Sequence, residues 1–589
     1  MPNNHFSTTN LAATDVVLDT PTSNFCTWNP ISGPPRTSST VVAEGNLKVT
    51  GQYNSSAQYY PRFMGTMAAS SGKWFYELRK NGATSGWYEE AGFKGINTTW
   101  PVGSHGLAGG STAGQWVSEG EIAWNANDGG IRVSHSGTAL ATGVGGGFSA
   151  DGDIIGLALD LDASPRTLKF FKNGSATTST TASVDLPTGG PDAFHPALDC
   201  TNTILSTTTA NFGQDATFAG TESGTTYTTD ASGGDTGGEF TMQPPAGYKA
   251  WTTKNLPEPT IAKPSEHFNT LTYASSGAKT GVGFQPDLVW VKARGNTYDH
   301  ELTDSVRGVT KALSSNATNV ESTDSTGLTA FGTDGFTVGA GTNYATSSMV
   351  AWSWKESATA GMDIVTWTGN DSGGFSPAPQ SVSHSLTVTP ELIIAKPRTA
   401  NGMGAGGWVV WTKDLTSGKY LIMNTTAGEA SWSDALVSSI GSSSVTFGSD
   451  TMGNGEDLNA DSFGGADTYV AYLFASVEGY SKVGSYSGNS LAAGPFVYCG
   501  FRPAYILIKN KTGSFGWFVW DTARNTLQPI TNYLYADTSA AEATDSAYKI
   551  DVVSNGFRPV AESSGLNNSA YNYIYYAVAE SPLKYASAR

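Results

Sequence analysis

Short runs of alternating apolar and polar residues recur along the chain, and long runs with the spacing of an amphipathic helix are nearly absent. Residues 72–80 (GKWFYELRK) alternate as a strand does when one of its faces lies on a core. Residues 152–162 form a mostly apolar run, and residues 167–174 end in an Asn-Gly pair, which is typical of a tight hairpin. Because turns rich in Gly, Asn, Asp and Ser separate such runs, the sequence predicts an all-β protein.

A second pattern occurs three times in the C-terminal half of the chain. Each copy has a proline, five mostly apolar residues and a lysine. A proline is tolerated at the start of a strand, and the apolar run predicts a strand buried on both faces. Aromatic strands precede and close each copy, so we expect three tandem β-sandwich domains, each with its own core. The three pairs are Pro286 and Lys292, Pro390 and Lys396, and Pro503 and Lys509.

Shifts in composition predict the domain boundaries. The polar, proline-containing start favours an extended arm, and three prolines between residues 255 and 264 favour a stiff connector. The predicted organisation is an arm at 1–40, a β-sandwich at 41–252, a linker at 253–264, and three repeats at 265–357, 358–479 and 480–589.

Charge and cysteine content exclude several classes of protein. The chain has 33 Lys+Arg and 50 Asp+Glu, a formal charge of −17, and no basic cluster, which argues against nucleic-acid binding. No apolar run reaches the length of a membrane span, and the start lacks the pattern of a secretory signal. Cys26, Cys200 and Cys499 are too far apart in the sequence for a disulfide framework or zinc site. We therefore expect three buried cysteines in a soluble protein made in a reducing cytosol.

Five segments in the first sandwich resemble, in the same order, the SPRY domain. The resemblance implies a two-sheet β-sandwich that presents variable loops to a partner and has no catalytic residues. The Gly/Thr-rich stretch at residues 220–238 departs from the family pattern and predicts a long surface loop or an insertion. The five segments are GKWFYE (72–77), GDIIGLALD (152–160), LKFFKNG (168–174), FHPA (194–197) and NFGQ (211–214).

The three repeats resemble a β-sandwich domain without assigned activity that occurs in virion proteins of tailed phages, often marine ones. The proline-to-lysine strand and residues 300–308 (HELTDSVRG) carry this resemblance. It implies a structural virion protein, made in the host cytoplasm, that acts as a tail fibre or adhesin and binds a host-surface glycan or protein. It also implies that the arm docks on other tail or capsid proteins and that the chain forms a homo-oligomer, first of all a trimer. A capsid decoration or head fibre protein and a glycan-degrading tailspike remain as alternatives.

Candidate catalytic residues are few. None of the seven histidines has the spacing to a glutamate found in helical zinc proteases, and nucleophile-elbow and phosphate-loop motifs are missing. His195 is expected to be hydrogen-bonded and half-buried. His300 lies beside Glu301 and near Asp299 and Asp304, which predicts a structural ion-pair cluster. We therefore expect no enzyme activity, no catalytic residues and no cofactor.

Acidic turns offer oxygen ligands of the kind that calcium prefers, but none has the spacing of a helical calcium loop. Solvated turns are the favoured interpretation, and no metal site is predicted. The acidic turns are Asp151 with Asp153, Asp160 with Asp162, residues 125–128 and residues 454–461.

Four tryptophans lie in or beside glycine-rich segments and are the candidates for contact with a ligand or receptor: Trp100, Trp116, Trp408 and Trp517. Aromatic rings offer large apolar faces with few ordering costs, which suits stacking on a sugar. The alternative, which the sequence favours, is that each tryptophan fills a sandwich core or a subunit interface.

Overall fold

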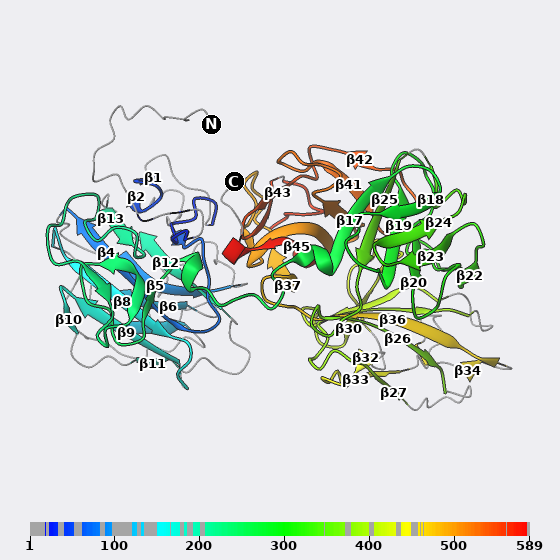
Figure 1. The fold of residues 1–589 in the computed structure, drawn as a ribbon, viewed down its shortest axis with the longest axis horizontal. Helices are drawn as coiled ribbons and strands as arrows, with labels where there is room; N and C mark the ends of the chain where they lie inside the picture. Colours follow the sequence, from blue (N-terminus) through cyan, green and yellow to red (C-terminus); the bar gives the residue numbers. More distant parts are fainter. Residues whose placement is uncertain are drawn as a thin grey trace. The chain divides into compact units, whose positions relative to one another are not determined.

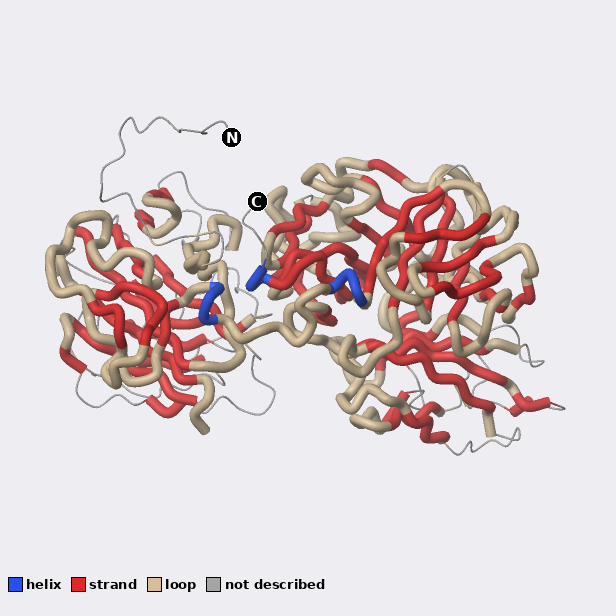
Figure 2. The backbone as a smooth tube through the Cα atoms, viewed as in Figure 1, coloured by secondary structure: helices blue, strands red, loops and turns tan. Residues whose placement is uncertain are grey.

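The computed structural model describes two compact units, residues 1–257 and 258–589 (Figures 1 and 2). Strands dominate both units, as predicted. Within the described residues the helices are single 3-10 turns, η2 (Thr253–Asn255), η3 (Pro264–Glu266) and η4 (Leu583–Tyr585), and none is long and apolar enough to cross a membrane. The described residues are 18, 20, 23–32, 40–51, 62–82, 89–96, 121–125, 131–134, 150–164, 166–176, 182–184, 193–200, 206–346, 348–370, 379–399, 406–431, 437–448, 458–459, 461–462, 465–560 and 562–585.

The first unit is built on two antiparallel sheets. The larger has the order β1 (Val41–Ala43), β2 (Lys48–Gly51), β13 (Ser206–Asn211), β4 (Lys73–Asn81), β8 (Ile154–Asp160), β9 (Arg166–Lys172) and β10 (Ser175–Ala176); β11 (Ala182–Val184) also pairs with β9, and β16 (Lys249–Ala250) pairs in parallel with β4. The smaller has the order β3 (Arg62–Met64), β12 (Phe194–Cys200), β5 (Glu89–Gly95), β6 (Glu121–Asn125) and β7 (Ile131–Ser134). The Gly/Thr-rich stretch predicted as a loop contains most of a hairpin, β14 (Tyr227–Thr229) and β15 (Asp235–Phe240).

Aromatic side chains of β4 join the two sheets of this sandwich. Tyr76 is fully buried, and its hydroxyl donates to the carbonyl oxygen of Gly92 on β5 at 2.7 Å. Residues 23–32, predicted as part of an extended arm, pack into the same unit instead: Phe25 bridges to Thr252, and Trp28 is fully buried. The apolar side chains at these positions account for the difference, because burying them removes them from water.

The second unit repeats one arrangement of strands three times, drawn from green to red in Figure 1. Each repeat has a larger and a smaller antiparallel sheet. In the first repeat the larger sheet has the order β17 (Phe268–Tyr273), β25 (Met349–Trp354), β19 (Leu288–Ala293) and β20 (Glu301–Asp304). In the second it has the order β26 (Met362–Thr368), β36 (Thr468–Phe474), β28 (Leu392–Pro397), β29 (Val409–Thr412), β30 (Lys419–Ile422) and β31 (Ala430–Ser431). In the third it has the order β37 (Ser481–Ser487), β45 (Asn572–Pro582), β39 (Phe501–Asn510), β40 (Trp517–Asp521), β41 (Asn532–Tyr535) and β42 (Ala543–Thr544).

The smaller sheets also share one strand order. The order is β18 (Gly277–Thr280), β24 (Gly335–Val338) and β23 (Leu328–Gly332) in the first repeat. It is β27 (Gln380–Ser383), β33 (Ser444–Phe447) and β32 (Val437–Ser438) in the second, and β38 (Val497–Tyr498), β44 (Gly556–Pro559) and β43 (Ile550–Val553) in the third. Two short hairpins, β21 (Lys311–Ala312) with β22 (Ser322–Thr323) and β34 (Asp461–Ser462) with β35 (Gly465–Ala466), complete the unit.

The three proline-to-lysine runs form β19, β28 and β39, which lie inside the larger sheets. Every residue of β19 and β28 is buried, as the apolar pattern predicts. Pro286 and Pro390 lie two residues before their strands, whereas β39 begins before its proline. The ladder between β39 and β45 shifts register on both sides of Pro503, and this irregularity accommodates a residue that cannot donate a ladder hydrogen bond.

The packing of the repeats corrects one expectation. Each repeat does have an apolar core of its own between its two sheets. However, the largest apolar cluster takes side chains from all three larger sheets, so the repeats are not independent domains in a row. They pack around a common core, to which Trp352, Tyr472 and Tyr576 contribute from equivalent positions of β25, β36 and β45. The boundaries predicted within the unit stay predictions.

The described free cysteines are buried, as expected. Cys26 is fully buried and Cys499 is 6% exposed. Burial raises the pKa of the Cys26 thiol to about 12, so it stays protonated at neutral pH. The side chain of Cys200 lies outside the described residues.

Candidate functional site

The three repeats are joined by one type of contact that occurs three times. Two residues after each buried lysine of the repeat pattern lies a basic residue, and it pairs with a glutamate of another repeat. In each case the backbone N–H of the glutamate also donates to the carbonyl oxygen of the basic residue, at 2.7 to 2.9 Å. The first repeat thus binds the third, the second binds the first, and the third binds the second. This closing ring consists of Arg294 with Glu542 (2.8 Å), Arg398 with Glu321 (2.9 Å) and Lys511 with Glu429 (3.4 Å).

Three buried rings reinforce these interfaces. His300, Trp408 and Trp517 occupy equivalent positions opposite the buried lysines in the strand register. The indole N–H of Trp408 donates to Ser314 O (2.8 Å) and that of Trp517 to Ile422 O (3.2 Å), each in another repeat. His300 Nε2 lies 2.9 Å from Tyr535 O in the third repeat. All three rings therefore form hydrogen bonds between repeats.

The surroundings of His300 show it to be neutral. Its Nδ1 accepts the indole N–H of Trp290 at 2.9 Å, so Nε2 carries the proton and donates to Tyr535 O. Burial lowers the pKa of His300 well below its ordinary value. The predicted ion-pair cluster around His300 is therefore wrong: the ring is an uncharged link between two repeats.

Trp408 and Trp517 do not serve as ligand contacts in this structure. Their side chains are 0% and 1% exposed and belong to the common core. The sequence placed them beside glycines, but their rings fill the space between repeats, so the core interpretation replaces the ligand-contact one for both. Trp100 and Trp116 lie outside the described residues.

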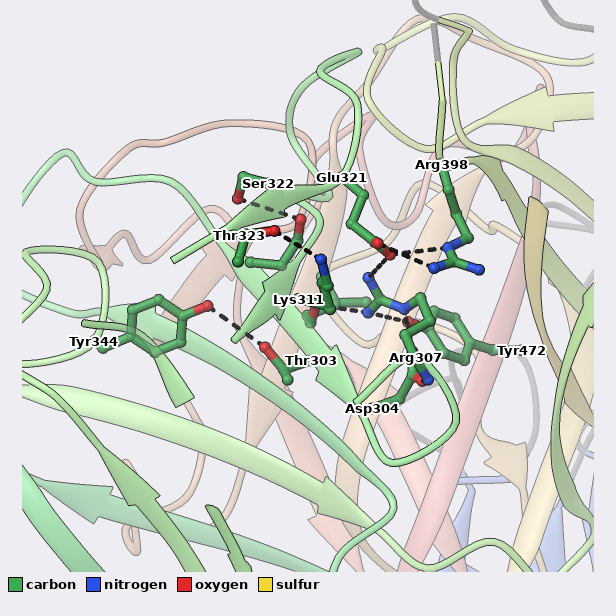
Figure 3. A network of polar contacts seen from close by, with 12 residues as sticks. Thr303, Asp304, Arg307, Lys311, Glu321, Ser322, Thr323, Tyr344, Arg398 and Tyr472 are labelled. Carbon is green, nitrogen blue, oxygen red and sulfur yellow. Dashed lines mark hydrogen bonds and ion pairs between the residues drawn. The ribbon is translucent and has the colours of Figure 1, made fainter. Parts of the chain in front are cut away.

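A buried polar network crosses the interface between the first two repeats (Figure 3). Arg307 pairs with Asp304 at 2.5 Å and with Glu321 at 3.2 Å. Tyr472 of the second repeat donates to Asp304 at 2.9 Å, and Arg307 donates to Tyr472 at 3.1 Å. Glu321 also accepts from Arg398, so the network is continuous with the closing ring.

The third repeat has the same pair, and the second does not. Arg524 and Asp521 lie 2.5 Å apart with fully buried side chains, and Trp352 of the first repeat donates to Asp521 at 2.9 Å. In the second repeat the equivalent positions hold Thr412 and Leu415. Both charges are replaced together, so neither is left buried without its partner.

A groove with a cavity volume of about 800 Å³ lies on the second repeat. The pairing of Val409 with Ile422 and of Val410 with Leu421 places Trp411 and Tyr420 next to each other on β29 and β30. Both rings are only partly buried, at the edge of this repeat's own core. The groove is lined by Trp411, Lys413, Lys419, Tyr420, Val437 and Ile440, among others.

The turn between β29 and β30 forms a firmly held wall of the groove. Lys419 N–H donates to Thr416 O at 2.9 Å, and Gly418 adopts a φ of 74° that a glycine accepts without strain. The backbone N–H and the hydroxyl of Thr416 both donate to the carboxylate of Glu429, at 2.9 and 2.8 Å. Glu429 belongs to the closing ring, so the wall is tied to the interface with the third repeat.

Two of the described residues that line the groove carry a positive charge, Lys413 and Lys419. The ammonium group of Lys413 lies 3.4 Å from Glu391, the Lys413 side chain is 35% exposed, and Lys419 donates to the hydroxyl of Ser431. The two lysines therefore place ammonium groups beside the aromatic pair, and that of Lys413 is already paired with Glu391.

The other predicted residues have structural roles. His195 is buried, its Nδ1 lies 2.9 Å from Gly65 O, and burial lowers its pKa to about 4. Asp151, Asp153, Asp160 and Asp162 bind neighbouring lysine, arginine and asparagine side chains or backbone N–H groups. Residues 125–128 and 454–461 lie mostly outside the described residues. Within the part of the chain that is described, no three His, Cys, Asp or Glu side chains are grouped to hold a metal ion.

Trp411 and Tyr420 were missed from the sequence. Neither residue lies in a glycine-rich segment of the kind that singled out the four candidate tryptophans. Both lie in short strands with buried neighbours, like many core residues of this chain. The available signal was the number of residues between them, which is smaller than in the matching segment of the third repeat.

These features define an all-β protein in which three sandwiches close around a common core, and one of them has an aromatic groove. The chain belongs to the family described as Domain of unknown function (DUF7483), a model of which matches residues 263–582, more than half of the chain. No curated protein matches it.

Solved SPRY domains are similar to about a third of the chain. The SPRY domain of human HERC1 is 14% identical, with 31% of this chain and 96% of that chain covered and a TM-score of 0.22. The PSpry domain of TRIM65 is 15% identical, with 32% and 89% covered and a TM-score of 0.22. The two-sheet description of the first unit rests on its own strand pairing.

Proposed function

We propose that the chain is a non-catalytic structural protein of a tailed-phage virion, a tail fibre or adhesin that binds the host cell surface. The sequence resemblance of the three repeats to virion domains supports the phage origin. The SPRY-like first unit supports a role in binding, since domains of that family present loops to partners. The net charge of −17 suits a surface that stays soluble in many copies.

The observation that carries the binding role is the groove with its partly buried Trp411 and Tyr420. Recognition residues work best on a scaffold that holds them in place before the ligand arrives. Here the closing ring and the common core fix the three repeats against one another, and the groove wall is bonded to that ring through Glu429. A ligand would meet a preformed surface.

The proposal includes partners that the sequence resemblance implies. The N-terminal residues would attach the chain to other tail or capsid proteins, and the ligand would be a host-surface glycan or protein. The assembled form would be a homo-oligomer, with a trimer as the first state to test.

The test uses the purified full-length chain and the particle that carries it. The chain should adsorb to host cells and compete with the particle for adsorption, and antibodies against it should label the tail. Labelling of the capsid would favour a decoration protein, and release of reducing sugar from host envelope material would favour a tailspike. A chain that neither adsorbs nor competes would contradict the proposed function.

A further inference from the structure

We infer that the groove of the second repeat binds an acidic oligosaccharide, with Trp411 and Tyr420 stacking on sugar rings and Lys413 and Lys419 binding the acidic groups. This inference rests on the proposed function and gives it a site and a ligand class. It follows from a comparison between two repeats of the same chain.

The third repeat has the same aromatic pair, but covers it. Trp520 and Tyr533 occupy the positions of Trp411 and Tyr420, as the pairing of Val519 with Leu534 shows. Their ring centroids are 6.1 Å apart, and the side chains are only 0% and 4% exposed. The pair in the third repeat is therefore an ordinary part of a core.

The cover comes from a longer connection. Ten residues join β40 to β41 in the third repeat, whereas six join β29 to β30 in the second. The longer connection carries Ile530, which is 1% exposed, forms a bridge with Ile550 and belongs to the core of that repeat. The second repeat keeps the aromatic pair, and its connection is four residues shorter. Large apolar rings left at an open groove in one copy of a repeated fold indicate a surface that is used.

The chemistry of the lining favours a sugar. A pyranose has an apolar face that stacks on an aromatic ring and a rim of hydroxyl groups that form hydrogen bonds. The groove matches both: Trp411 and Tyr420 lie side by side, and Ser439 supplies an exposed hydroxyl. Lys413 and Lys419 place two ammonium groups on the groove that can pair with the carboxylate or sulfate groups of a saccharide, which favours an acidic saccharide over a neutral one.

The first repeat supplies a matched control for the charge. Lys311 pairs with Thr323 in the ladder and donates to its hydroxyl at 2.7 Å, as Lys419 pairs with Ser431 and donates to its hydroxyl. Thr303 of the first repeat occupies the position that Trp411 occupies in the second, as the pairing of Thr303 with Val289 and of Trp411 with Ile393 shows. Lys311 therefore has the local contact of Lys419 without the tryptophan of the groove.

The experiment measures binding of the full-length chain to an alginate tetrasaccharide, with maltotetraose as the neutral probe of equal length, by calorimetry at low and high salt. We expect the acidic probe to bind more tightly than the neutral one and to weaken with salt. W411A and K419A should each weaken binding, W411A roughly tenfold, whereas K311A should leave it unchanged. Circular dichroism of each variant tests whether it is folded, and Y420F, which keeps the ring, should retain binding.

Three results would overturn the inference: no binding of either probe, equal binding of both, or loss of binding in K311A as well as K419A. Cell adsorption separates this inference from the proposed function. If the wild-type chain competes with the particle and folded W411A competes equally well, the groove inference fails and the adhesin role stands. If the chain binds the acidic probe through the groove but does not adsorb to cells, the adhesin role fails.

Discussion

Arg294 and Glu542 are 248 residues apart in the sequence and are joined side chain to side chain by two charge-assisted hydrogen bonds of 3.0 and 2.8 Å. The N–H of Glu542 also donates to the carbonyl oxygen of Arg294 at 2.7 Å. These bonds join the last repeat to the first, and through them three consecutive sandwiches become a closed arrangement with one common core.

Replacing Glu542 should destabilise the second unit strongly. Its carboxylate also accepts from Arg524, whose side chain is fully buried, so E542Q weakens the binding of two arginines at once. We expect a loss of about 2–4 kcal/mol in the free energy of unfolding, measured by urea unfolding followed by tryptophan fluorescence. E266Q is the control, because Glu266 pairs with Lys263 with side chains 59% and 73% exposed, and exposed pairs contribute little. Equal effects of the two variants would contradict the structural role of the ring.

The second repeat suggests a double-mutant experiment in the third. D521T and R524L should each cost about 3 kcal/mol, because each removes one member of a buried ion pair, and the remaining contact of Arg524 with Glu542 or of Asp521 with Trp352 compensates only in part. The double variant D521T/R524L copies Thr412 and Leu415 and removes both charges, so it should be more stable than the sum of the single effects implies. Unfolding of all four proteins gives the coupling energy. Simple additivity would show that the two charges do not depend on each other.

His300 should make the second unit sensitive to mild acid. Its pKa in the folded protein lies well below its ordinary value because of burial, whereas the unfolded chain takes up a proton near pH 6.5. Below pH 6.5 the unfolded state therefore binds more protons, and stability falls as the pH falls toward the folded pKa. H300W, which copies the residue found at this position in the other two repeats, should reduce that loss. Thermal unfolding at pH 5 and pH 7 measures it, and an unchanged difference in H300W would contradict the prediction.

Glu356 should produce the opposite pH dependence. Burial and a hydrogen bond with Asp363 raise the pKa of Glu356 to about 8, so the folded protein holds a proton that the unfolded chain releases above about pH 4.5. The stability from this proton is fully present below pH 4.5 and is lost as the pH rises through 8. E356Q keeps a donor toward Asp363 without a titrating proton, so it should be the more stable protein at pH 9. Thermal unfolding at pH 6 and pH 9 tests this, and E266Q again serves as the exposed control.

Sequence patterns predicted the parts of the fold that depend on local periodicity. The all-β class and the strands that contain Lys292, Lys396 and Lys509 follow from alternation and apolar runs, and the structure confirms them, with each strand continuing one residue past its lysine. The roles of His300 and Trp517 were less accessible, although both lie eight residues after the lysine of their repeat. That shared spacing was the signal that they are equivalent and therefore have one structural role.

The closing ring could not be predicted in this way. Each basic residue follows a recognisable strand, and Glu321, Glu429 and Glu542 all lie ten residues after the first residue of the preceding strand. That spacing marks the three glutamates as equivalent, but it does not say which repeat each one contacts. Their partners are set by how the sandwiches pack, which local periodicity does not record. The groove depends on how many residues connect two strands and not on which residues form them, so its signal in the sequence is the shorter segment between Trp411 and Tyr420.

The common core has a consequence for synthesis of the chain. Trp352 and Trp354 of the first repeat pack against Tyr505 of the third, with ring centroids 5.8 and 5.5 Å apart, and Phe474 packs against Tyr576 at 4.9 Å. Until the ribosome has translated the last hundred or so residues, the rings of the first two repeats lack their packing partners from the third repeat. A premature stop codon after the second repeat would release a chain whose part of the common core is exposed to solvent, and such a chain should aggregate or be bound by chaperones.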